Sequence, residues 1–141
     1  MKLSISNIGW SGADNSCVYG IMSSYGFSGL EIAPTKIFPE SPYEKLDSAR
    51  VWREELQRKY GFVVSSIQSI WYGHSETIFG SKEERKILFD YTKKAIDFAE
   101  AIGCSNLVFG CPKNRSITDS EDVNVAIDFF KKLGTYAYMH H

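Results

Sequence analysis

The residues best suited to binding chemistry follow the apolar run NLVFG (106–110), which predicts a buried strand. The next residues are CPKNR (111–115), where Lys113 and Arg115 flank Asn114. The two cations could hold a phosphate or a carboxylate, and an arginine can bind either group in bidentate fashion. Alternatively, the segment is a surface loop with two solvated cations, since proline and asparagine suit a turn.

The only carboxylate at an expected strand end is Glu31, which follows Leu30. It could bind a substrate hydroxyl or support a catalytic base. Alternatively, a neighbouring lysine or arginine neutralises it inside the fold, because a buried charge requires a partner. Gln68 could hydrogen-bond a sugar hydroxyl, although an amide cannot act as a general base. Packing at a strand end is the alternative for Gln68.

Three aromatic side chains, Trp10, Trp71 and Tyr72, follow expected strands, and Phe38 lies in a nearby loop. Together they could form an apolar wall against a sugar ring. Alternatively, they belong to the core or to an interface, where aromatic residues contribute much of the buried area.

Other kinds of site have little support in the sequence. It contains no glycine-rich phosphate loop, no Ser/His/Asp set and no zinc-knuckle spacing. His74 lies in a loop, where we expect it to be solvated. The terminal pair His140 and His141 could chelate a metal but equally suits a frayed helix end, so we predict no site there.

The composition indicates one globular domain over residues 1–141. Hydrophobic residues make up 43% and aromatic residues 14% of the 141 residues, and the net charge is −1. This balance disfavours a dedicated nucleic-acid binder, and no run of about 18 apolar residues could cross a membrane. The N-terminus lacks the features of a signal peptide. We expect a cytoplasmic protein with three free thiols, on Cys17, Cys104 and Cys111.

Three segments predict helix starts by the same pattern, a Ser or Thr three residues before a Glu: SPYE (41–44), SKEE (81–84) and TDSE (118–121). Glycines in YGF (25–27), YGF (60–62) and IGC (102–104) predict helix ends. The segment 91–103 has its apolar residues at helical spacing, with the inward face formed by Ala95, Ile96, Phe98, Ala99 and Ile102. We also expect helices over 14–25 and 119–139, although Gly134 could end the latter and leave 135–141 as a strand.

Strands are expected over 2–8, 28–32, 63–70 and 106–110. Strands that alternate with helices predict an α/β fold with a parallel sheet and crossover helices. Four such βα units make a small open sheet or half of a (βα)₈ barrel, which needs about 250 residues.

The sequence resembles the sugar phosphate isomerase/epimerase family, the xylose-isomerase-like TIM barrels. The resemblance covers essentially the whole chain and corresponds to the N-terminal half of such a barrel. It is carried by YGFSGLEIAPTKIF (25–38), IQSIWYG (67–73), YTKKAIDFAEAIGCSNLVFGCPKNR (91–115) and AIDFFKKLGTYAY (126–138).

This resemblance implies a metal-dependent isomerase or epimerase that acts on a sugar or sugar phosphate. Such enzymes transfer a proton next to a carbonyl through an enediolate, which a divalent cation (Mn, Mg or Zn) stabilises. In the family the Glu, Asp, His and Glu ligands come mainly from the ends of strands five to eight. We therefore expect this chain to lack the metal ligands and to be inactive alone, with no catalytic residue assigned.

In such barrels the working face is the C-terminal end of the strands. The resemblance therefore implies substrate contacts there, and Gln68 lies where many relatives carry a His. The candidate substrate-binding residues are Trp10, Glu31, Gln68, Trp71, Tyr72, Lys113 and Arg115.

The sequence bears on two other functions. A non-catalytic half-barrel could form a homodimer that closes a full barrel, because unpaired edge strands invite pairing. The alternative partner for those edges is a missing C-terminal half. The DNA-repair branch of the family requires several His and acidic zinc ligands and a basic groove. This sequence has three His and no basic cluster, so it does not meet these requirements.

Overall fold

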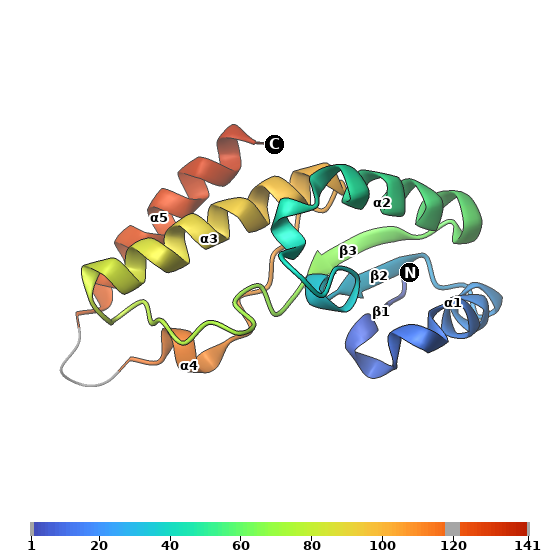
Figure 1. Ribbon diagram of the computed structural model, residues 1–141, viewed down its shortest axis with the longest axis horizontal. Helices are drawn as coiled ribbons and strands as arrows, with labels where there is room; N and C mark the ends of the chain where they lie inside the picture. Colours follow the sequence, from blue (N-terminus) through green and yellow to red (C-terminus); the bar gives the residue numbers. More distant parts are fainter. Residues whose placement is uncertain (1, 118–121, 141) are drawn as a thin grey trace.

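A computed structural model describes residues 2–117 and 122–140. Its centre is a parallel sheet of three strands in the order β1 (Ser4–Ser6), β2 (Gly29–Ile32) and β3 (Val63–Ile67) (Figure 1). The expected α/β architecture is confirmed, because each successive strand is reached through a helical crossover.

The helices follow the strands in chain order. They are α1 (Asn15–Ser24), α2 (Leu46–Tyr60), α3 (Lys82–Ala101), α4 (Pro112–Arg115) and α5 (Val123–Met139). Short 3₁₀ turns occupy Asn7–Gly9, Gly12–Asp14, Pro34–Lys36 and Pro42–Glu44. Helix α3 packs between α2 and α5 (Figure 1). No helix in the described ranges is long and apolar enough to span a membrane.

The two faces of the sheet differ in polarity. Leu30, Ile32, Val64 and Ile67 point toward the helices and are almost completely buried. Since side chains alternate along a strand, the residues between them point to the opposite face, and these are mostly polar. The core therefore lies between the sheet and the helices, while the other face is open.

The prediction of a fourth strand over 106–110 is wrong, because this segment forms no regular strand. In 106–110 only Leu107 forms a bridge, with Ile67 of β3. The amide of Ile67 donates to the Asn106 carbonyl at 2.9 Å, and the amide of Val108 donates to the Ile67 carbonyl at 2.7 Å. Pairing stops there because β3 ends at Ile67 and its chain turns away, so residues beyond Val108 have no neighbouring strand.

The three expected capping boxes have different outcomes. SKEE (81–84) is confirmed, because the Ser81 hydroxyl accepts from the Glu84 amide and the Glu84 carboxylate accepts from the Ser81 amide. SPYE (41–44) is wrong. Ser41 has a left-handed backbone (φ 45°) instead of the extended one that a cap requires, and α2 begins only at Leu46.

The third box, TDSE (118–121), lies outside the described residues. Helix α5 begins at Val123, where the Asp122 carboxylate accepts from the Asn124 amide at 2.8 Å. This helix runs through Gly134 to Met139, so the alternative strand over 135–141 is wrong.

The expected helix ends are confirmed. Gly26, Gly61 and Gly103 have φ values of 74°, 71° and 67°, in the left-handed region where glycine carries no steric penalty. The inward face of α3 is also confirmed, since all five expected residues are buried. Helical periodicity was a sufficient signal here because this face packs against two neighbouring helices.

Replacing the cap residue tests how much the confirmed box contributes. We expect Ser81→Ala to lower the free energy of unfolding by about 1 kcal/mol, because the first turn of α3 loses an acceptor for an orphan amide. Urea unfolding measures the effect. Ser41→Ala is the matched control, and we expect it to stay within about 0.5 kcal/mol of the parent. Equal losses in both variants would contradict this assignment.

Candidate functional site

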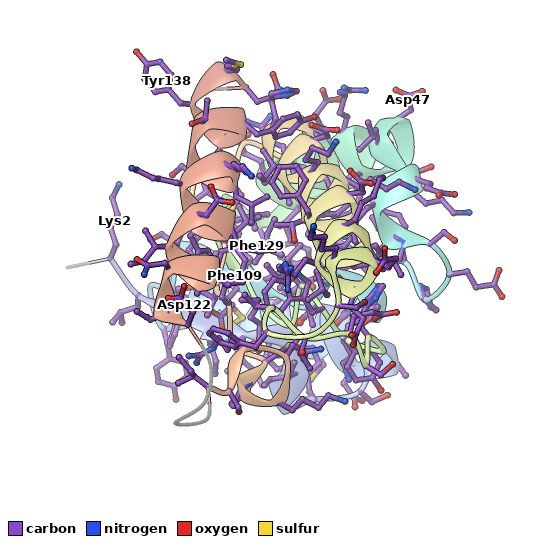
Figure 2. All side chains as sticks on the ribbon, turned by 90° about the vertical axis from the view of Figure 1, so that its left-hand side faces the viewer. Lys2, Asp47, Phe109, Asp122, Phe129 and Tyr138 are labelled. Carbon is purple, nitrogen blue, oxygen red and sulfur yellow. The ribbon has the colours of Figure 1, made fainter. Side chains whose placement is uncertain are left out.

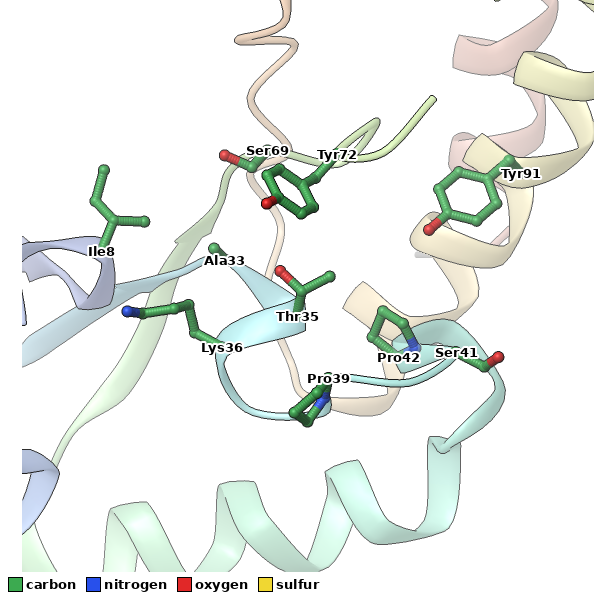
Figure 3. A pocket seen from close by; sticks show the side chains of 10 residues that line it. All are labelled: Ile8, Ala33, Thr35, Lys36, Pro39, Ser41, Pro42, Ser69, Tyr72 and Tyr91. Atoms are coloured by element: carbon green, nitrogen blue, oxygen red, sulfur yellow. The ribbon is translucent and has the colours of Figure 1, made fainter. Parts of the chain in front are cut away.

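An open pocket of about 700 Å³ lies beyond the C-terminal ends of the three strands (Figure 3). The segments that follow β1, β2 and β3 each contribute to it, and α3 supplies one further side chain. Its lining is Ile8, Ala33, Thr35, Lys36, Pro39, Ser41, Pro42, Ser69, Tyr72 and Tyr91. This is the end of the sheet at which parallel α/β folds place their sites.

Backbone strain is concentrated in this pocket. Among the described residues, Ser41 (φ 45°) and Ser69 (φ 55°) are the only non-glycine residues with positive φ, and both line it. A left-handed backbone costs a residue with a Cβ roughly 1–2 kcal/mol. Such strain persists where the surroundings hold it, and it occurs preferentially at functional sites.

The pocket combines aromatic rings with hydrogen-bonding groups. Figure 3 shows the rings of Tyr72 and Tyr91 on one side, with their hydroxyls directed into the pocket, and Thr35 across from them. Burial raises the pKa of Tyr91, so its phenol is a neutral donor at pH 7. Lys36 donates from Nζ to the Trp10 carbonyl at 2.8 Å, which leaves two of its three N–H groups for a ligand.

A polar network on the open face of the sheet leads to the pocket. The Ser66 hydroxyl donates to Glu31 Oε2 at 2.6 Å, and Gln68 Nε2 donates to the Ser6 hydroxyl at 2.6 Å. Ser69, which lines the pocket, donates to Gln68 Oε1 at 3.1 Å. Glu31 and Gln68 therefore lie on the face next to the pocket and not in its lining.

The hydrogen-bond partner of Glu31 is a serine and not the lysine or arginine that the sequence suggested as an alternative. No lysine or arginine in the described ranges pairs with its carboxylate, which accepts from the Ser66 hydroxyl. Neutralisation by a neighbouring cation is therefore wrong. Two β strands in register explain the pairing, since Glu31 of β2 lies directly opposite Ser66 of β3.

Of the three expected aromatic residues, only Tyr72 lines the pocket. Trp71 is 1% exposed, and its indole N–H donates to the Thr92 hydroxyl at 2.8 Å. Trp10 donates to the Asn15 side chain and packs edge-on against Tyr19. The structure thus places Trp71 in the core and Trp10 beside α1.

The pocket includes side chains that the sequence analysis did not select, chiefly Tyr91, Lys36 and Ser41. Tyr91 lies on α3, four residues before Ala95 of the predicted inward face, and no motif marked it as a site residue. The segment TKIF (35–38) gave no signal for Lys36, because a lysine after a strand is usually solvated.

Lys113 and Arg115 are exposed on α4 and do not line the pocket. Asn114, which lies between them, holds a neighbouring loop in place. Asn114 is completely buried, and its Nδ2 donates to the carbonyls of His74 (3.0 Å) and Glu76 (2.8 Å). The polar segment after the fourth apolar run therefore holds the loop that follows Tyr72.

That loop also carries a paired histidine. His74 Nδ1 lies 2.9 Å from Glu76 Oε2, and its ring packs on Tyr91 with 4.1 Å between ring centroids. A backbone amide and the His74 hydrogen bond lower the pKa of Glu76. His74 is thus partly buried behind the pocket wall, in contrast to the expected solvated position.

The residues present do not fit a divalent metal site. Within the described ranges, no three His, Cys, Asp or Glu side chains come together where they could hold an ion. Glu31 is hydrogen-bonded to a serine, and the pocket lining contains no carboxylate or imidazole.

No protein-family model and no curated protein matches this sequence. Solved structures do match the fold. One is the apo form of 3-keto-D-glucoside 4-epimerase, YcjR, from E. coli, with a TM-score of 0.64 and 14% sequence identity. The match covers 99% of this chain and 53% of that chain.

The chain has the fold of half a TIM barrel. The expected resemblance to xylose-isomerase-like barrels is confirmed at this level, since the matched epimerase has that architecture. This chain spans about half the length of that enzyme, and it contributes three regular strands and a single bridge instead of the expected four strands.

Relieving the strain at Ser41 should stabilise the protein. We expect Ser41→Gly to raise the free energy of unfolding by about 0.5–1 kcal/mol, because glycine accepts the left-handed backbone and Ser41 makes no capping hydrogen bond. Ser48→Gly within α2 is the control and should lower it by about 0.5 kcal/mol. Destabilisation by both glycines in urea unfolding would refute the assignment of strain to Ser41.

Removing the buried amide should release the loop behind the pocket. We expect Asn114→Ala to lower the free energy of unfolding by about 2–4 kcal/mol, because two carbonyls lose their donor. Hydrogen exchange in residues 74–78 should also accelerate. Lys113→Ala, one residue away and exposed, should leave both measurements unchanged. Unaltered exchange in the Asn114 variant would rule out this role.

Proposed function

We propose that the pocket binds a sugar or sugar phosphate, and that this chain provides the substrate-binding half of an isomerase- or epimerase-type barrel. One observation carries the proposal: two tyrosines, a threonine, a lysine and two strained serines line a single pocket at the C-terminal ends of the strands. The similarity of fold to a sugar epimerase supports the same substrate class.

The pocket chemistry suits a carbohydrate. Tyr72 and Tyr91 offer apolar ring faces to C–H groups of the sugar, and their hydroxyls offer hydrogen bonds to its polar edge. The free N–H groups of Lys36 can bind an anionic substituent as a point charge. Glu31 and Gln68 on the adjoining face, together with Ser6 and Ser66, extend the polar surface below the pocket.

Isomerisation requires a base that removes a proton next to a carbonyl. The lining supplies binding and orientation but no carboxylate or histidine for that step. The family chemistry also calls for a divalent cation, and the described residues do not form a site for one. This chain should therefore bind the sugar without turning it over, and the base must come from elsewhere in a complete barrel.

A single truncation tests the proposed site. We expect Tyr72→Ala to weaken binding of a sugar phosphate, or of a 3-keto-D-glucoside, by about five- to tenfold, because it removes a ring face worth roughly 1 kcal/mol. Titration calorimetry or ligand-observed NMR gives the dissociation constant. Tyr138→Ala is the matched control, since Tyr138 is an exposed tyrosine near the end of α5 and does not line the pocket.

Lys36→Gln separates two ligand classes. It should weaken binding of a phosphorylated sugar while leaving the matching neutral sugar unchanged, since the cation acts on the phosphate alone. Absence of binding by the parent chain to any of these sugars at millimolar concentration would overturn the proposal. Binding that Tyr72→Ala leaves intact would place the site elsewhere.

A further inference from the structure

The first edge of the sheet exposes an apolar side chain that belongs to the core layer. Ile5 of β1 lies opposite Leu30 of β2, so both point toward the helix-covered face. Leu30 is completely buried, whereas Ile5 is 43% exposed because no strand or helix of the described residues covers this edge. Leu3 and Ile8, on either side of β1, are exposed as well.

The opposite edge carries an apolar groove of about 260 Å³. It lies between the segment 105–109 and helix α5, and its lining includes Leu107, Phe109, Phe130 and Leu133. Figure 2 shows Phe109 next to α5, on the side that faces α3. The groove opens at the edge where only one bridge pairs this segment with β3. The backbone amides and carbonyls of Leu107 and Phe109 make no backbone hydrogen bond within the described residues, so they are available to another strand.

The two terminal helices have matching apolar stripes. On α1, Cys17 and Ile21 are exposed one turn apart, and Tyr25 follows at the helix end. On α5, Val123, Ile127 and Phe130 follow one another at intervals of four and three residues, so they share one face of the helix, and all three are exposed. Such stripes face another element in most folded proteins. Each stripe belongs to the helix next to an open sheet edge.

We infer that a second copy of this chain docks head to tail, with its β1 beside segment 106–110 and its Ile5 in the groove next to Phe130. The two surfaces complement each other in three respects, namely an unpaired strand beside an unpaired strand, an apolar side chain opposite an apolar groove, and a helix stripe opposite a helix stripe. All strands run parallel, as a continuing barrel requires.

Two copies satisfy both edges at once. The fold corresponds to half of a closed barrel, so a head-to-tail contact returns to its starting point after two chains. The open face of the sheet does not oppose closure, because its polar groups already bond within the chain. Examples are Ser4 with Ser65, and Gln68 with Ser6.

Closure would also complete the pocket. In the ring, the segment that follows 106–110 in one copy lies next to the end of β1 in the other. Ile8, a pocket residue that is 56% exposed, lies at that end. Lys113 and Arg115 of the partner subunit would then approach the pocket from the side that is open in a single chain. These cations gain a role in the dimer that they lack within one copy.

The test is the molar mass of the full chain by light scattering after size exclusion, across a range of protein concentrations. We expect twice the mass of one chain. Ile5→Lys and, from the other side of the contact, Phe130→Lys should each raise the dimer dissociation constant by roughly 100-fold or more, because each change affects both contacts. Circular dichroism and the melting temperature at low concentration show whether each variant still folds.

Val51→Lys is the matched control. Val51 is also an exposed apolar residue but lies on α2, away from both edges, so the dimer should persist. A parent chain that is monomeric at high concentration, or that forms larger open assemblies, would overturn the inference. A dimer that survives both lysine substitutions in folded protein would do so too.

Discussion

The register of the three parallel strands determines most of the molecule. Leu30 and Val64 are aligned with Ile5, so one face of the sheet is apolar and takes the helices. An irregularity between Leu30 and Glu31 shifts the register, and as a result Ser66 lies opposite Glu31. The polar face follows from the same alignment, because side chains alternate with a period of two.

Side chains of the two outer strands, β1 and β3, meet across the central strand β2, and this contact leaves little space above β2. The hydroxyls of Ser4 and Ser65 lie 2.6 Å apart across Gly29. A Cβ at Gly29 would lie 3.1 Å from the Ser4 Cβ and 3.3 Å from the Ser65 Cβ, closer than is usual between such atoms. The bond between the outer strands thus depends on a glycine in the central one.

The pocket depends on buried amides that hold its loops. The Asn7 side chain accepts from the Ala33 amide at 2.8 Å and so joins the end of β1 to the end of β2. Asn114 holds the loop after β3, because its side-chain amide donates to the carbonyls of His74 and Glu76. Ordered loops on a rigid sheet are where binding residues usually lie, and here they present hydroxyls, the Tyr72 ring and one lysine, while α3 adds the Tyr91 ring. The pocket of this half-barrel combines hydrogen-bonding groups with aromatic rings, while the open edges of its sheet leave room for a second half.

Local signals in the sequence were sufficient for the alternation of strands and helices as far as α3, the helix ends at Gly26, Gly61 and Gly103, the capping box at Ser81 and the inward face of α3, because each leaves a pattern among residues close together in the sequence. The half-barrel resemblance was likewise available from its motifs.

Tertiary structure decided the rest. The run 106–110 reads as a strand, but a strand needs a neighbour, and β3 ends too early to provide one. Trp71 and Tyr72 are adjacent in sequence, yet one is core and the other lines the pocket, since the turn at Ser69 sets which side chain points inward. Tyr91 reaches the pocket from a distant helix, and no spacing along the chain encodes that contact.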